Sequence, residues 1–122
     1  MAIKSELMAR GFSAGQAESV VGIVANTLTA AGSSQATALA IGADINIFTT
    51  TASSTGAILP STLGAGDSMT VVNHGANTLS VYPPVGGKIA NGSTNAAFSV
   101  AATKAATFTC IDNLNFLAEL SA

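Results

Sequence analysis

Charged residues are scarce in this chain of 122 residues, which has four Lys or Arg and six Asp or Glu. Charged residues make up 8% of the sequence and hydrophobic residues 48%, whereas about 25% of the residues in a soluble domain are usually charged. A monomer with so few charges has little to keep its surface soluble. The surface is therefore expected either to meet a membrane or to be covered by other subunits.

Long apolar runs are also missing. The best candidate, Val20–Ala25, is much shorter than the roughly 18–20 apolar residues needed to span a bilayer. The N-terminal residues include Glu6 and Glu18 and lack the apolar segment of a signal peptide, so neither a membrane partner nor a signal sequence is expected. Assembly with other subunits is the favoured explanation.

Basic residues are too few and too scattered to bind nucleic acid. The four that exist are Lys4, Arg10, Lys88 and Lys104. Nucleic-acid binding requires a clustered positive surface, and the six acidic residues outnumber these four. We therefore expect no nucleic-acid partner.

Residues suited to catalysis are few. The only histidine, His74, lies in an expected turn beside amides rather than beside a carboxylate that would orient a general base. Asp44 and Asp67 each precede an expected strand, where their side chains are expected to bond nearby backbone groups. Calcium binding at these aspartates is the alternative, but the number of ligands is too low. The sequence predicts no enzyme, no cofactor and no metal site.

Two other residues have competing interpretations. Cys110 is the only cysteine, which excludes an internal disulfide, and its place in an apolar/Thr alternation predicts a small buried hydrophobic residue rather than a reactive thiol. Tyr82 precedes Pro83-Pro84. Its ring is either packed on the prolines, which is the commoner case, or a platform for stacking a sugar.

From Asn26 onward the sequence has a β-rich texture, with turn residues about every 8–12 residues. The expected strands are Gln35–Ile41, Asn46–Thr51, Ala57–Leu59, Ser68–Asn73, Thr78–Tyr82, Ala97–Ala101, Ala105–Ile111 and Phe116–Leu120. No convincing internal repeat is present. Strands of this number and length predict a small β-sandwich, jelly roll or barrel-like domain.

One β-hairpin is expected within Gly66–Pro84. Two alternating apolar runs, Met69–Asn73 and Thr78–Tyr82, flank the polar residues His74–Asn77. Gly75 and the neighbouring asparagines are expected to supply the positive φ of a tight reversal. The hairpin contains no reactive group and is expected to be scaffold.

The N-terminal residues read as helical rather than β. A short helix that contains Ile3, Leu7 and Met8 is expected to end at Gly11. A second helix is expected to begin at the capping box Ser13-x-x-Gln16. Its apolar stripe at helical spacing consists of Ala17, Val20, Val21 and Val24. The predicted organisation is an α-helical arm, residues 1–26, before a β-rich domain, residues 27–122.

Several runs of the sequence resemble small structural proteins of tailed bacteriophages. They are Asn26–Gly32, Gln35–Leu39, Asp44–Asn46, Gly66-Asp67, Val71–Asn73, Gly75-Ala76, Leu79–Pro83, Gly86-Gly87 and Ile89. The resemblance implies a β-structured component of the virion and, among such components, a capsid decoration (cement) protein on the capsid surface, made in the cytoplasm of the bacterial host. It also implies a homotrimer with the major capsid protein as its partner.

The apolar arm is expected to contact the capsid or neighbouring subunits. The expected contact residues are Ile3, Leu7, Met8, Phe12, Val20, Val21 and Val24. The alternative function is a receptor- or glycan-binding module of a head or tail fibre. Exposed aromatic residues would mark such a module, but aromatic residues make up only 5% of the chain and tryptophan is absent.

Overall fold

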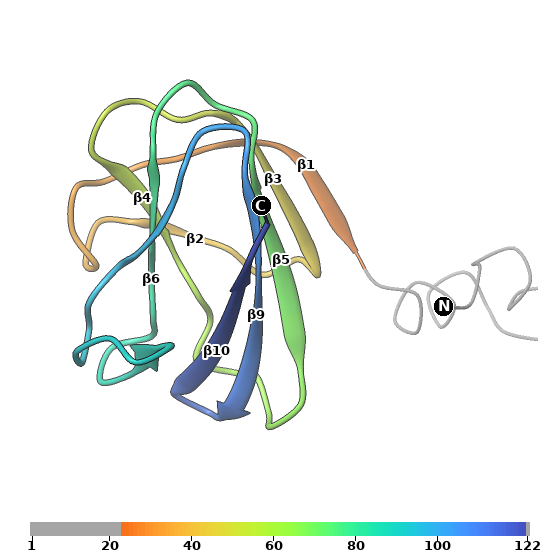
Figure 1. The fold of residues 1–122 in the computed structure, drawn as a ribbon, viewed down its shortest axis with the longest axis vertical. Helices are drawn as coiled ribbons and strands as arrows, with labels where there is room; N and C mark the ends of the chain where they lie inside the picture. The colour runs from red at the N-terminus through yellow and green to blue at the C-terminus, as the bar shows by residue number, and fades with distance from the viewer. Residues whose placement is uncertain (1–22, 122) are drawn as a thin grey trace, which may run out of the picture.

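The computed structural model describes residues 23–121, which form ten β-strands and no helix (Figure 1). The strands are β1 (Val24–Thr29), β2 (Leu39–Ala40), β3 (Ile45–Thr50), β4 (Thr55–Ile58), β5 (Ser68–Asn73), β6 (Leu79–Tyr82), β7 (Lys88–Ile89), β8 (Phe98–Val100), β9 (Ala105–Asp112) and β10 (Asn115–Leu120). The predicted β-rich fold is confirmed for these residues. Among them, no helix that could cross a membrane is found.

The first six strands alternate between two sheets. β1, β3 and β5 pair in parallel in a six-stranded sheet of order β1-β3-β5-β9-β10-β7. β2, β4 and β6 pair in parallel in a four-stranded sheet of order β2-β4-β6-β8. We call β1–β6 the parallel coil. After each of these strands the chain crosses to the other sheet, and successive strands of the same sheet lie side by side and parallel. β9 and β8 then pair antiparallel with β5 and β6.

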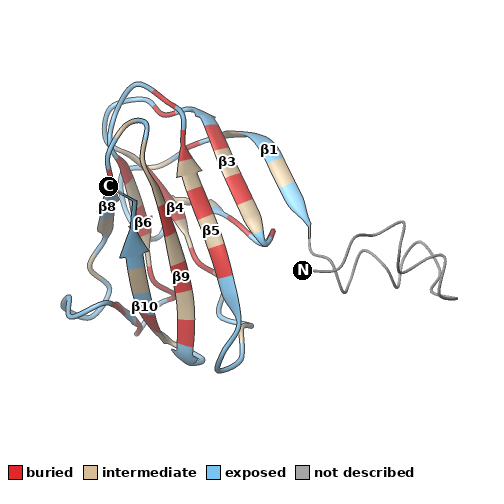
Figure 2. Ribbon diagram, turned by 45° about the vertical axis from the view of Figure 1, so that its right-hand side comes forward, coloured by how far each residue is buried: buried red, intermediate tan, exposed pale blue. Residues whose placement is uncertain are grey.

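The hydrophobic core lies between the two sheets. Along β5 and β9, buried residues alternate with half-buried or exposed ones, so that one face of each strand meets the core (Figure 2). Phe48 and Phe108 are fully buried, and the Phe108 ring packs edge to face against Phe98 with ring centroids 5.6 Å apart. The other large buried side chains are Phe116, Leu59, Leu79, Val71, Val81 and Val100.

The predicted hairpin between β5 and β6 is wrong. β5 pairs with β3 and β9 in one sheet, and β6 pairs with β4 and β8 in the other. Residues 74–78 therefore form a corner between sheets rather than a reversal within one. Gly75 does not have a positive φ. A glycine is required there because a Cβ would collide with Thr51.

Most strand positions agree with the sequence prediction, with three differences. Only Leu39–Ala40 of the expected strand Gln35–Ile41 is a strand, and β1 and β7 were not expected. Val24, which was expected on a helical stripe, begins β1. Ala25 and Asn26, the last two residues of the predicted helical arm 1–26, also belong to β1. Residues 1–22 of that arm lie outside the described residues, so the division into arm and domain stays a prediction.

A cluster of buried polar groups links neighbouring strands at the corner formed by residues 74–78. The Asn73 side chain is fully buried; its Oδ1 accepts hydrogen bonds from Thr51 Oγ1 (2.8 Å) and from the Gly75 amide (3.0 Å). Its Nδ2 donates to the carbonyls of Asn77 (2.8 Å) and Val100 (2.9 Å). All four hydrogen-bonding positions of this amide are thus filled, which makes it a structural residue.

Candidate assembly surface

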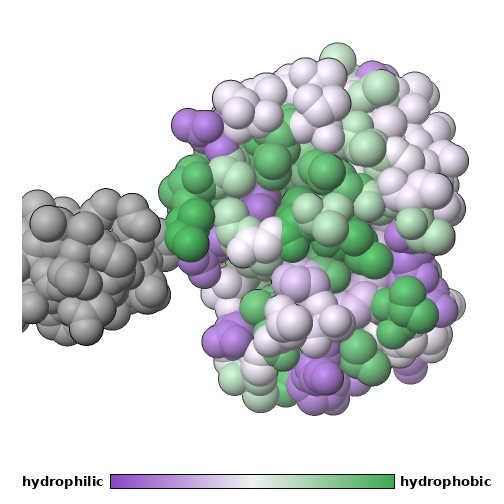
Figure 3. All heavy atoms as spheres, turned by 180° about the vertical axis from the view of Figure 1, so that it is seen from behind, coloured by the Kyte–Doolittle hydropathy of each residue, from purple (hydrophilic) through white to green (hydrophobic). Residues whose placement is uncertain are grey.

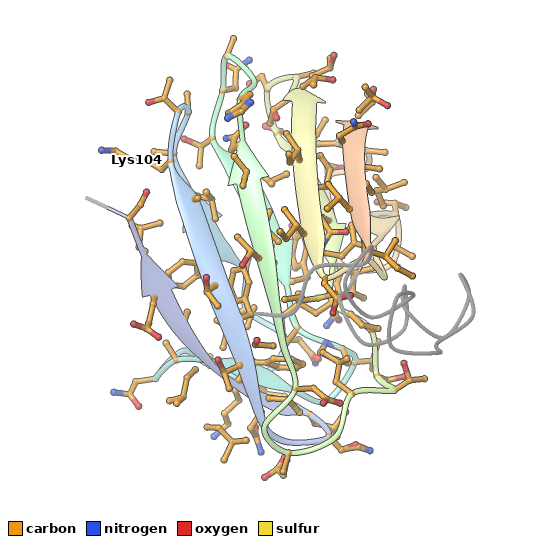
Figure 4. The ribbon with its side chains drawn as sticks, turned by 90° about the vertical axis from the view of Figure 1, so that its right-hand side faces the viewer. Lys104 is labelled. Carbon is orange, nitrogen blue, oxygen red and sulfur yellow. The ribbon has the colours of Figure 1, made fainter. Side chains whose placement is uncertain are left out.

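The outer face of the six-stranded sheet is a regular surface of the described chain. Its residues are those that alternate with the buried ones, and the strand register aligns them in rows across the sheet. One row runs Ile45, Thr70, Thr107, Glu119, and a second runs Ile47, Val72, Ala105. We call this surface the outer face. Figure 4 looks onto it.

Apolar and threonine side chains dominate the outer face. Ile45, Ile47 and Val72 are half-buried by their neighbours alone, while Ile111 and Leu117 are 51% and 56% exposed. The hydroxyls of Thr70 and Thr107 lie 3.2 Å apart and form a hydrogen bond across the strands. Because the two hydroxyls bond to each other, these threonines present mainly their methyl groups to a partner.

Charge is confined to the margins of this sheet. β1, β3 and β5 contain no charged residue. Asp112 ends β9, while Lys88 and Glu119 lie on β7 and β10, at one side of the sheet. Lys104 lies directly before β9 and points away from the sheet (Figure 4). A β-branched face with charge only at its margins favours contact with another protein over contact with water.

A second apolar surface lies where the parallel coil begins. β1 and β2 are edge strands of the two sheets. Ile23 and Val24 are 56% and 55% exposed, and Leu28 and Leu39 pack on the core but are only partly buried. Figure 3, seen from behind relative to Figure 1, shows hydrophobic residues gathered on this side of the molecule. We call this surface the open end.

The candidate catalytic and metal-binding residues are not brought together. His74 is exposed in the corner between β5 and β6. Asp67 accepts a hydrogen bond from the Gly64 amide (2.9 Å), the predicted role in a turn. Asp44 accepts from the Ile23 amide (2.8 Å), which fixes the start of β1 beside β3. Within residues 23–121, no group of three His, Cys, Asp or Glu that could hold a metal ion is present.

Cys110 is buried, as its sequence context predicts. Desolvation by burial raises the pKa of its thiol, and the negative charges of Asp112 and Asp67 raise it further. A thiol in this environment is poorly nucleophilic. The pKa of Asp112 itself is lowered, chiefly by a hydrogen bond from the Asn115 side chain and then by one from the Leu114 amide. Cys110 lies within β9, where its thiol donates to the Leu63 carbonyl (3.7 Å), and Asp112 ends that strand beside the β9–β10 turn. Both groups have structural partners.

Tyr82 does not present its ring as a stacking platform. The residue is half-buried, and its hydroxyl donates to the Ser33 carbonyl at 3.4 Å. A Cβ added to Gly56 would lie 2.9 Å from Cε2 of Tyr82, so the ring lies close over that glycine. Pro83 and Pro84 are both buried. The ring is therefore part of the packing of the four-stranded sheet.

Of the seven expected contact residues, only Val24 is described. It is exposed at the open end and pairs with Ile45 of the outer face. Ile3, Leu7, Met8, Phe12, Val20 and Val21 lie outside the described residues. The sequence prediction did not include the outer-face residues Ile45, Ile47 and Val72, although runs such as Val71-Val72 are apolar on both faces of the strand, a pattern typical of a sheet covered on both sides.

Comparison of the chain with protein-family models, curated proteins and solved structures finds no match. Function is therefore inferred from the residues of this chain.

Proposed function

We propose that this chain is a structural protein of a tailed-bacteriophage particle that decorates and stabilises the capsid as a β-fold homotrimer. Its partner would be the major capsid protein, and its place the capsid surface after synthesis in the host cytoplasm. Of the β-sandwich, jelly roll and barrel-like architectures expected from the sequence, we propose the β-sandwich, which the division of the strands into two sheets supports. The phage assignment itself derives from the sequence resemblance.

The observation that supports a structural role is the outer face. Three adjacent strands of a six-stranded sheet carry no charge, and their outward residues include Ile45, Ile47 and Val72. Covering these β-branched side chains removes apolar area from water, which contributes about 25 cal/mol for each Å² covered. Subunit contact through this face would also account for the low charge of the whole sequence.

The N-terminal arm is a second proposed contact with the capsid or with neighbouring subunits. The same apolar residues could instead cover their own domain, and the labelling experiment described in the next subsection distinguishes these roles.

The fibre alternative has less support. A glycan- or receptor-binding module would use exposed aromatic rings, and none of the aromatic residues within residues 23–121 is exposed. These residues are Phe48, Tyr82, Phe98, Phe108 and Phe116. A glycan array with the full chain would test this function directly, and a specific saturable signal would favour it over decoration.

The decoration function is tested by copy number in purified particles, measured by quantitative mass spectrometry against the major capsid protein. We expect hundreds of copies in a simple ratio to the capsid subunits. A handful of copies would assign the chain to a tail or fibre. Absence from particles would overturn the virion assignment.

A further inference from the structure

Further strands cover the parallel coil on the side of β5 and β6 but not on the side of β1 and β2. β9, β10 and β7 extend the six-stranded sheet beyond β5, and β8 extends the four-stranded sheet beyond β6. Beside β1 and β2, by contrast, residues 23–121 provide no further strand in either sheet. Terminal repeats of stacked β-structures need a covering unit with a polar outer surface, because their last layer otherwise exposes the core.

The open end exposes apolar groups of this last layer. Ile23 and Val24 are more than half exposed. Leu28 and Leu39 come from the two different edge strands and both pack against the core cluster while remaining partly exposed. The hydrophobic surface in Figure 3 thus lies over the side where β1 and β2 leave the core without cover.

The chain enters the domain at this surface. The Ile23 amide donates to Asp44 Oδ2 (2.8 Å), and the Ile23 carbonyl accepts from the amides of Asp44 (2.9 Å) and Ile45 (3.1 Å). These three hydrogen bonds hold residue 23 beside the start of β3. Residues 1–22 are therefore attached directly at the margin of the open end, where their effective concentration is of the order of millimolar.

This segment is long enough for one further turn of the coil. Val24 pairs with Ile45 and Ile45 pairs with Thr70, so equivalent positions lie 21 and 25 residues apart. The 22 residues that precede Ile23 are enough to pass over both edge strands. Within the coil, β3 follows β2 and β5 follows β4, so the chain reaches each of these strands of the six-stranded sheet from the four-stranded sheet. A chain that reached β1 in the same way would first cross β2.

The composition of the segment suits a covering unit. It holds four of the ten charged residues of the chain, which are Lys4, Glu6, Arg10 and Glu18. It also holds large apolar residues, among them Phe12, Val20 and Val21. The apolar residues can cover the open end while the charged residues meet water. β1, β3 and β5 contain no charged residue, so these strands cannot provide such a charged outer surface themselves.

We propose that residues 1–22 cover the open end of their own chain, against β1 and β2. This inference concerns the isolated protein in solution and does not depend on the virion function. The proposed cover is the N-terminal segment of the same polypeptide. The same segment from a second copy, or a separate partner, is an alternative outcome of the test.

The test places a nitroxide spin label at a Ser19→Cys substitution in the full chain, with Cys110→Ala to remove the native thiol. In a ¹⁵N-labelled sample carrying the spin label, we expect loss of amide peak intensity in β1 and β2. In a mixture of spin-labelled ¹⁴N chains and unlabelled ¹⁵N chains, we expect no loss. A spin label at Asn113→Cys, in the exposed β9–β10 turn three strands away from β1 in the six-stranded sheet, serves as the control that should leave the β2 peaks unchanged.

The alternative outcomes are distinct. Loss of β1 and β2 intensity in the mixed sample would show that the segment covers the open end of a second copy, and would overturn the proposal. Loss confined to residues adjoining position 23, with β2 unchanged in both samples, would show that the segment does not cover the open end and is available to another partner. That result would overturn this inference and leave the decoration function standing.

Discussion

The Thr51 hydroxyl donates to Oδ1 of Asn73 at 2.8 Å, within the buried corner where β3 and β5 both end. These two residues are adjacent in space because their strands are neighbours in the parallel coil, although 22 positions separate them in the chain. The bond is one of four to the Asn73 side chain. The polar corner therefore depends on correct stacking of the coil.

We expect Asn73→Ala to lower the free energy of unfolding by roughly 2–4 kcal/mol, because it leaves buried donors and acceptors without partners. Urea unfolding of the purified chain measures this. Asn113→Ala, in the exposed β9–β10 turn, is the matched control and should change stability by no more than about 0.5 kcal/mol. Equal losses for both variants would contradict the structural role of Asn73.

Gly75→Ala is expected to destabilise the domain by about 1–3 kcal/mol, because the added Cβ would overlap Thr51 in a packed corner. Gly42→Ala is the matched control, since nothing lies within 4 Å of a Cβ at that position and its φ is not positive. Thermal unfolding followed by circular dichroism compares the two. A loss for Gly42→Ala as large as that for Gly75→Ala would show that alanine itself, and not the contact with Thr51, is responsible.

The Cys110 thiol should make stability depend on alkaline pH. Its pKa is raised in the folded chain, first by burial and then by Asp112 and Asp67. The unfolded chain therefore loses this proton at a lower pH, near the ordinary thiol pKa of about 8.5. The stabilising contribution is complete below that pH and is lost as the pH rises through the folded pKa.

Urea unfolding across this alkaline range should show a steeper loss of stability for the native chain than for Cys110→Ala. Labelling with a thiol reagent should also be slow in the folded chain and fast in urea. Rapid labelling without denaturant would contradict the buried, protonated state of this thiol.

Charge on the outer face should prevent self-association without unfolding the domain. Ile111→Lys combined with Leu117→Lys places two cations at exposed positions of β9 and β10. We expect analytical ultracentrifugation to show the proposed trimer for the native chain and a monomer for the double variant, with the circular dichroism spectrum unchanged. Val85→Lys, at an exposed loop residue, should leave the oligomer intact. An unchanged oligomer in the double variant would exclude these positions of the outer face from the subunit contact.

The strands could be predicted from sequence largely because alternation is a local property. Met69, Val71 and Asn73 are buried on one face of β5, a period-two pattern visible in the sequence. The partner of each strand is not local: Val71 pairs with Asn46 and with Ala106. The sequence shows that a turn follows β5 but not whether the chain returns to the same sheet, so the hairpin was predicted in error.

The surface was harder to predict than the core. Val24 was assigned to a helix because Val20, Val21 and Val24 have helical spacing, yet its backbone pairs with Ile45 as the edge of a sheet. β7 has only two residues, Lys88–Ile89, which is too short to show a period. The outer face became apparent only once the register placed Ile47, Val72 and Ala105 in one row. Its low charge was visible in the composition, but its location was not.

The central place of β5 has a consequence for biosynthesis. β5 pairs with β3, which precedes it, and with β9, which follows some 30 residues after β5 ends. While the chain is still on the ribosome, β5 has one open side until β9 emerges, and pairings between distant segments form slowly. The nascent chain thus holds an unpaired, uncharged strand edge while residues 74–112 are being synthesised, and such an edge is a template for aggregation. Chaperone demand during overexpression should accordingly fall when β9 can pair early, as in a circular permutant that places β9 before β5.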